Sequence, residues 1–186
     1  LEGVGMTSTD TPTVMMDKLA EAAWAQLADM SPRALHIDEI AAAAGIAPSA
    51  ARAVSGSITA LILHQLARLD RQAILESLAD IEDAGEVPVR DKIMEALMHR
   101  FEVYAPYRAQ MIQLEAAARR DPVLGLRLVE SLLQATRMLL RMAGDDLAGF
   151  RGEARVRGVT GLAMVVASCL AHRRYARPFD DSEGDR

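Results

Sequence analysis

The feature that most constrains this chain is a short segment whose helical pattern stops and restarts. Apolar residues recur at helical spacing from Ile37 to Ala44, and Gly45 then ends the run, because glycine most readily adopts the left-handed conformation after a helix. Pro48 stands at the first position expected for a second helix, 48–54, where its missing N–H costs nothing. Two short helices joined by a tight glycine-containing turn are the pattern of a helix-turn-helix.

At these residues the chain resembles the TetR family of bacterial transcription regulators. Asp38 to Ile46 are similar to the family's first motif helix and turn, 49–54 fall where its recognition helix lies, and Gly56 to Leu61 match the start of its next helix. The resemblance implies an all-α protein with an N-terminal three-helix helix-turn-helix domain and a C-terminal helical bundle for ligand binding and dimerisation. The chain departs from the family at Ile58, which replaces a phosphate-binding lysine, and at 52–55, which replace aromatic and histidine residues.

Three side chains on the second motif helix are the candidate DNA contacts: Ser49, Arg52 and Ser55. Arginine can hold a guanine edge with two hydrogen bonds, and serine is undemanding. Charge supports this interpretation weakly, because residues 13–71 carry five basic and six acidic side chains and the whole chain has a net charge of −5. Phosphate neutralisation normally supplies much of the affinity for DNA. The expected partner is a double-stranded DNA operator. The alternative, a helix-turn-helix that is kept only as a scaffold and does not bind DNA, stays open.

That second interpretation has its own resemblance. The chain is also similar to the lipid-binding accessory proteins of coenzyme-Q biosynthesis, which share the TetR fold and do not act as repressors. The similarity lies in Gly45–Ala53, Arg100–Arg108 and Asp180–Ser182. It implies a lipid- or isoprenoid-binding protein without DNA binding. Proteins of that family end in an amphipathic lipid-contacting helix, whereas residues 175–186 here are predicted to form a polar tail.

The apolar spacing and the glycine and proline residues predict an entirely helical chain. The predicted helices cover 13–30, 37–44, 48–54, 57–83, 89–104, 107–120, 122–143 and 153–174. The helix over 57–83 begins at the end of a helix-turn-helix domain, 13–56, and bridges into a larger domain, 57–174. The small domain is predicted to bury together Trp24, Leu27, Ile40 and Leu61.

The larger domain is expected to bind a small hydrophobic ligand and to form a homodimer. Apolar side chains that could line a pocket between its helices, or serve as plain core, are Met94, Leu97, Met98, Phe101, Met111, Leu114, Leu133 and Met138. The dimer is predicted to form through 123–142 and 153–174, because small residues such as Gly158, Gly161 and Ala167 allow close helix approach. Leu162 and Val165 would supply contact area.

The sequence gives little support to an enzyme. The four histidines, His36, His64, His99 and His172, are scattered, and their spacing matches no metal site. We therefore expect no catalytic residue, no metal and no cofactor beyond a small hydrophobic ligand. The single Cys169 suits a reducing cytoplasm, and the apolar run around it is shorter than the roughly 20 residues that span a bilayer.

Overall fold

The computed structural model describes residues 11–83, 87–144 and 146–172, without the side chains of 81–83, 166–167 and 169–172. In these ranges all regular structure is helical, as the sequence predicts, and there is no β-strand. The elements are α1 Pro12–Gln26, η1 Pro32–Ala34, α2 Ile37–Ala43, α3 Pro48–Val54, α4 Ile58–Asp83, α5 Val89–Tyr104, η2 Ala105–Tyr107, α6 Arg108–Ala118, α7 Pro122–Met142 and α8 Gly149–His172. None of the helices in the described ranges combines the length and apolarity needed to cross a membrane.

Most helix ends lie within two residues of their predicted positions, and the end of α1 and the start of α8 differ by four residues. Helix α1 begins at Pro12 and ends at Gln26, four residues before its predicted end. Its N-cap is Thr11, and Thr11 Oγ1 accepts a hydrogen bond from the Val14 N–H at 3.4 Å. Proline is favoured at the first helical position, so Pro12 fixes this start. Ser57 caps α4 in the same way, since its Oγ accepts from the Ala60 N–H at 3.3 Å.

Helix α8 begins at Gly149, four residues before its predicted start, in a segment that the sequence predicts as a loop. Gly149 has a φ of 69°, which is left-handed and favours glycine. At Gly152 an added Cβ would lie 2.2 Å from the carbonyl carbon of Leu147, so the first turn of α8 packs directly on the preceding backbone. The glycines that suggest a loop are therefore used to begin the helix.

The chain divides into two compact units. Of the described residues, the first unit contains 11–69 together with Gln113–Ser131, and the second contains those of Asp70–Ile112 together with those of 132–172. The division falls within α4, after Leu69, whereas the sequence places the domain boundary at 56/57. The predicted polar tail, 175–186, lies outside the described residues.

The first unit has the predicted helix-turn-helix at its N-terminal end. Helices α1, α2 and α3 pack against one another. The four residues predicted to be buried together are at most 3% exposed: Trp24, Leu27, Ile40 and Leu61. Between α2 and α3, Gly45 has a φ of 66° and the Ile46 N–H donates to the Ala41 carbonyl at 2.9 Å. This bond closes the turn of the motif.

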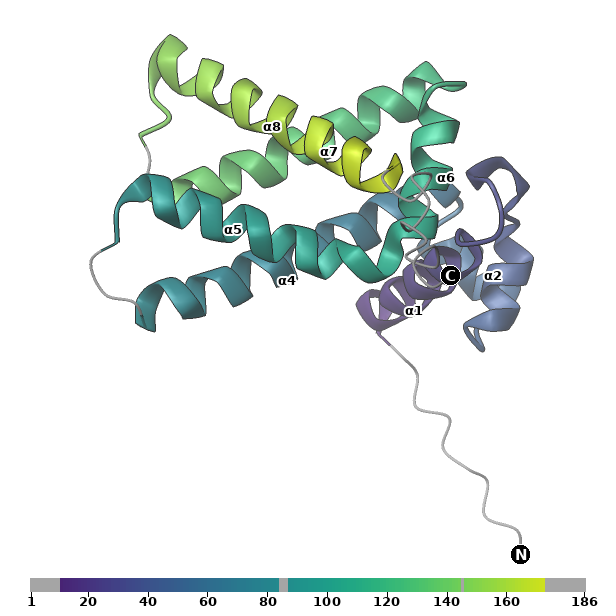
Figure 1. The fold of residues 1–186 in the computed structure, drawn as a ribbon. Coiled ribbons are helices and arrows are strands. Elements are labelled where there is room, and N and C mark those ends of the chain that lie inside the picture. Colours follow the sequence, from purple (N-terminus) through teal and green to yellow (C-terminus); the bar gives the residue numbers. More distant parts are fainter. Residues whose placement is uncertain (1–10, 84–86, 145, 173–186) are drawn as a thin grey trace, which may run out of the picture. The chain divides into compact units, whose positions relative to one another are not determined.

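The second unit is a packed helical core. Its central apolar cluster takes two residues from each of three helices: Ala96, Leu97, Leu139, Leu140, Val156 and Ala163. These pairs come from α5, α7 and α8, and in Figure 1 α5 runs beside α4 while α8 runs beside α7. The partly buried side chains of Ile93, Phe101 and Leu133 pack against the cluster. Helix α8 faces this core with one side only.

Candidate functional site

The second helix of the motif, α3, packs on the rest of the first unit through one narrow face. Ala51 is fully buried, and it is the one side chain among the seven of α3 that is classed as buried. Ser49 and Arg52 are exposed on the outer side of the helix, as expected for side chains that reach into a groove of DNA. Ser55 is buried at the end of the helix, and its Oγ donates to the Ser57 carbonyl at 3.4 Å. We therefore leave Ser55 out of the candidate DNA contacts.

Arg52 has a partner within the motif. Its Nη2 lies against Oδ1 of Asp38 on α2, and the two side chains are 54% and 56% exposed. An exposed ion pair of this kind stabilises a protein by about 0–1 kcal/mol, because water screens both charges. A bidentate arginine–guanine contact discriminates by about 1–3 kcal/mol. The ion pair with Asp38 is therefore weaker than a base contact would be, so it would not prevent Arg52 from exchanging Asp38 for a base edge if α3 binds DNA.

Other arginines of the first unit are paired with acids as well. Arg33 Nη2 lies 3.4 Å from Asp121 Oδ2, and Arg68 Nη2 lies 2.8 Å from Glu21 Oε1. Hydrogen bonds from the Leu124 and Val123 N–H groups, together with Arg33, hold the pKa of Asp121 below its usual range. Paired arginines give the first unit little excess positive charge, so any DNA binding by it should neutralise few phosphates.

The outer side of α3 borders an apolar groove in the first unit. The groove has a volume of about 580 Å³ and is lined by Pro12, Thr13, Met15, Met16, Ala50, Ala53, Val54 and His64. His64, one of the two polar side chains of the lining, is held by α1, since its Nε2 lies 2.7 Å from Asp17 Oδ1. The volume is within the range of small-molecule sites, about 300–1,000 Å³. The sequence reasoning missed this groove because its walls come from three separate helices.

The residues predicted to line a pocket in the larger domain are dispersed. Met94, Met98 and Met138 are between 44% and 52% exposed. Leu97 is buried and borders a cavity of about 10 Å³, which has room for a single water molecule. The remaining members are Phe101 and Leu133, which pack on the core cluster of the second unit, Met111, which is half-buried, and Leu114, which is buried within the first unit. Of the eight side chains, only Leu97 lines a cavity described beside this core.

A buried polar cluster, which the sequence reasoning did not identify, lies beside the same cavity. Asp70 on α4 is 7% exposed, and its Oδ1 accepts hydrogen bonds from Arg100 Nε at 2.7 Å and from the Tyr104 hydroxyl at 3.0 Å. The Arg100 guanidinium also lies 5.0 Å from the centre of the Tyr104 ring. The cavity is bordered by Asp70, Arg100 and Thr136, and Thr136 accepts a hydrogen bond from Thr160 at 3.1 Å. These contacts join α4 to α5 and α7 to α8 by polar groups inside an apolar core.

Burial controls the ionisation of this cluster. Burial raises the pKa of Tyr104 well above its usual range, and the neighbouring Asp70 carboxylate raises it further. Burial alone would lower the pKa of Arg100, but the Asp70 carboxylate and the Tyr104 hydroxyl together outweigh it and the net change is upward. Arg100 is therefore a permanent cation and Tyr104 a neutral hydrogen-bond donor. The Asp70 carboxylate on α4 thus accepts hydrogen bonds from one cation, Arg100, and one neutral donor, Tyr104, both on α5. These two bonds fix the position of α5 along α4.

The described residues contain one set of possible metal ligands. The ligand atoms of Asp80, Glu95 and His99 lie within 4.8 Å of one another at the α4–α5 pair. This set lies outside the helix-turn-helix, and none of its three residues belongs to the Asp70 cluster, although His99 directly precedes Arg100 in α5. Comparison of the sequence with protein-family models and with curated proteins finds no match.

Proposed function

We propose that this protein is a ligand-responsive DNA-binding transcription regulator of the TetR type. The observation that carries the proposal is the helix-turn-helix itself: two seven-residue helices, a Gly45 turn and an outer face with Ser49 and Arg52 exposed. In such motifs the second helix enters the major groove. Arg52 is the proposed base-reading residue, and Ser49 a supporting contact.

Replacement of Arg52 tests the proposal directly. We expect Arg52→Ala to weaken binding to a sequence selected from a random duplex pool by about 10- to 100-fold, the loss of one bidentate contact. Arg33→Ala is the matched control, because Arg33 is also exposed and paired with an acid but lies outside α3. Equal losses in both variants, or failure to enrich any sequence at low salt, would contradict base reading by Arg52.

The partner of Arg52 provides a prediction of opposite sign. We expect Asp38→Asn to strengthen binding to the same duplex severalfold, because it removes a negative charge beside the phosphates and releases Arg52 from its ion pair. Fluorescence anisotropy at several salt concentrations measures the effect. The logarithm of affinity should fall only shallowly with the logarithm of salt concentration, since few phosphates are neutralised. Unchanged or weaker binding by Asp38→Asn would mean that Arg52 does not approach the DNA.

We further propose that the regulator is a homodimer joined through α8. The side of α8 opposite its core contacts presents small and apolar residues, with Leu162 and Val165 more than half exposed. Cβ atoms added at Gly158 and Gly161 would meet no atom within 4 Å. Two such faces allow close approach of paired helices, and a two-fold axis makes one surface serve both subunits. Dimerisation would also place two helix-turn-helix motifs on one operator.

A charge at Gly161 tests the dimer. We expect Gly161→Glu to give monomers in analytical ultracentrifugation, since it would bury an unpaired carboxylate between subunits. The open space around Gly161 means that the subunit itself should tolerate the new side chain. Ala148→Glu, at an exposed position before α8, is the control and should leave the sedimentation unchanged. A dimer that persists in Gly161→Glu would exclude this face of α8.

The apolar groove beside α3 supports a second candidate, a carrier of an apolar ligand such as a lipid or isoprenoid. Its volume of about 580 Å³ and its methionine and alanine lining fit an apolar chain better than a polar metabolite. Native mass spectrometry of purified protein, followed by solvent extraction, would identify such a ligand. Retention of the ligand together with failure to enrich any DNA sequence would favour the carrier, and loss of the ligand in Ala53→Glu would place it in the groove.

A further inference from the structure

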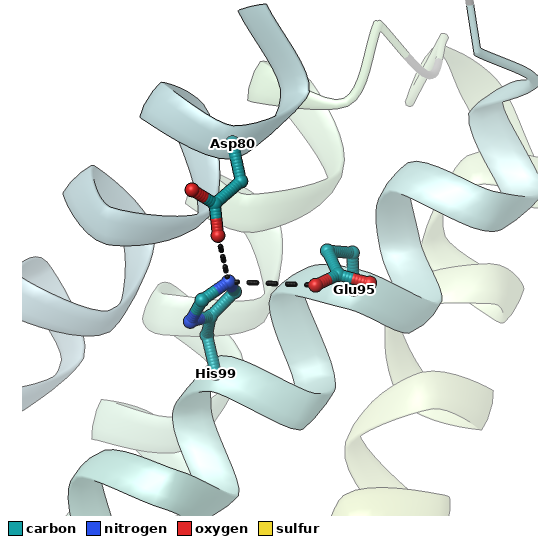
Figure 2. Close-up of side chains that lie close together, drawn as sticks. All are labelled: Asp80, Glu95 and His99. Atoms are coloured by element: carbon teal, nitrogen blue, oxygen red, sulfur yellow. Dashed lines mark hydrogen bonds and ion pairs between the residues drawn. The ribbon is translucent and has the colours of Figure 1, made fainter. Parts of the chain in front are cut away.

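The Asp80, Glu95 and His99 side chains form a cluster with an uncommon feature: two carboxylates approach one ring nitrogen. His99 Nε2 lies 2.8 Å from Asp80 Oδ2 and 3.5 Å from Glu95 Oε1. Figure 2 shows both carboxylates directed at this nitrogen, Asp80 from α4 and Glu95 from one turn earlier on α5. A ring nitrogen carries one proton or one lone pair, so it can form a well-aligned hydrogen bond with only one of them. A metal ion can bind all three.

We propose that these three side chains bind a divalent transition-metal ion, with Zn²⁺ as the best match. Zinc takes histidine nitrogen and carboxylate oxygen at about 2.0–2.2 Å, which places tetrahedral ligands roughly 3.4 Å apart. The distance between His99 Nε2 and Glu95 Oε1, 3.5 Å, is already close to this value. Asp80 lies closer, and its side chain is 60% exposed, so it can rotate outward to admit an ion. The fourth position is left to water.

The other ring nitrogen supports this assignment. His99 Nδ1 lies 3.8 Å from Glu102 Oε2, one turn further along α5. Metal-binding histidines commonly donate their second N–H to a carboxylate, which fixes the tautomer and directs the free lone pair at the metal. The Glu102 side chain is 71% exposed and can close this distance by rotating. His99 itself is only 16% exposed, so its ring is held in place while the carboxylates adjust.

The donor set selects the class of metal. One imidazole and two carboxylates suit zinc and its first-row neighbours, whereas magnesium and calcium prefer oxygen alone. The ligands come from two helices, so a bound ion would connect α4 to α5, in addition to the contact of Asp70 with Arg100, the residue that follows His99. A metal ion that binds the folded protein but not the unfolded chain would raise the melting temperature.

Zinc titration of tag-free, chelator-treated protein tests the site. We expect one Zn²⁺ per chain by calorimetry, and a rise in melting temperature of roughly 5–10 °C at a hundredfold excess over Kd. Co²⁺ should give the intense visible absorption of a tetrahedral site. His99→Gln should abolish all three signals, and Glu102→Gln should weaken the affinity about tenfold through the ring orientation.

His64→Gln is the matched control. His64 also lies 2.7 Å from an aspartate, Asp17, so this variant tests whether any surface histidine–carboxylate pair is sufficient. Zinc binding should be unchanged in it. Asp80→Asn and Glu95→Gln alter exposed side chains and should each weaken zinc binding in a fully folded protein, which circular dichroism checks. Absence of a calorimetric signal for the unaltered chain, or equal zinc binding by His99→Gln, would overturn the proposal.

Discussion

Replacing Arg100 with methionine should lower the free energy of unfolding by about 3–5 kcal/mol, the typical effect of leaving one member of a buried ion pair alone. Asp70 is 7% exposed, so its carboxylate would remain in the core without a cation. Methionine retains the unbranched stem of the side chain without the guanidinium, which limits the loss of packing. Urea denaturation followed by circular dichroism at neutral pH measures the change. A loss below about 1 kcal/mol would show that water replaces the guanidinium.

Two further variants separate charge burial from general damage. Arg137→Met breaks a partly exposed pair with Glu153 in the same unit, and should cost less than about 1 kcal/mol. The double variant Asp70→Leu with Arg100→Met removes both charges, and it should recover much of the loss, because an apolar replacement of a buried pair is often neutral or stabilising. If the double variant does not recover stability, the polar contacts of the Asp70 cluster themselves hold α4 against α5, and an apolar pair cannot replace them.

The second large effect is a loss of stability in alkaline solution. Burial raises the folded-state pKa of Tyr104 well above that of the unfolded chain, near 10. Below pH 10 both states keep the proton and the stability is unaffected. Above pH 10 the unfolded chain releases the proton first, so the free energy of unfolding falls by about 1.4 kcal/mol for each pH unit until the folded pKa is reached.

Denaturation curves between pH 9 and 11 for the unaltered chain and for Tyr104→Phe measure this linkage. The variant should lose roughly 1.5–3 kcal/mol at neutral pH, because its hydrogen bond to the Asp70 carboxylate is gone, but it should lack the additional alkaline decline. Tyr107→Phe, in the following turn, leaves Tyr104 in place and should keep the decline. Identical pH slopes for all three proteins would mean that the Tyr104 hydroxyl ionises in the folded state as it does in water.

Local signals explain why the fold could be predicted from the sequence. The bounds of α3 and α5 agree with the prediction because Pro48 and Pro88 mark their starts, and the burial of Trp24 and Ile40 follows from helical spacing. Helix α8 was predicted to start too late because Gly149 and Gly152 are equally compatible with a loop and with the tightly packed start of a helix. Gly152 is required by the close approach of Leu147, and that approach exists only in the folded chain.

The polar contacts could not be predicted with the same certainty, because they join residues far apart in the sequence. Asp70 and Arg100 are 30 residues apart, and Asp80 and His99 are 19 apart. One signal for Asp70 was available: Leu66, Ala73 and Ile74 surround it at helical spacing, which places a carboxylate on an apolar stripe. No comparable local signal marks His99, since Glu95 and Glu102 alone describe an ordinary solvated helix face.

The way in which α3 packs on the rest of the first unit bears on how the proposed DNA specificity could change. Ala51 is its one buried side chain, whereas Ser49, Arg52 and Ala53 are exposed. Substitutions at these three outer positions therefore remove no core contact, and surface substitutions usually change stability by less than about 0.5 kcal/mol. Under the proposed function, the preferred DNA sequence could thus diverge without a loss of folding. A library randomised at 49, 52 and 53 should yield folded proteins at high frequency, from which new operator specificities can be selected.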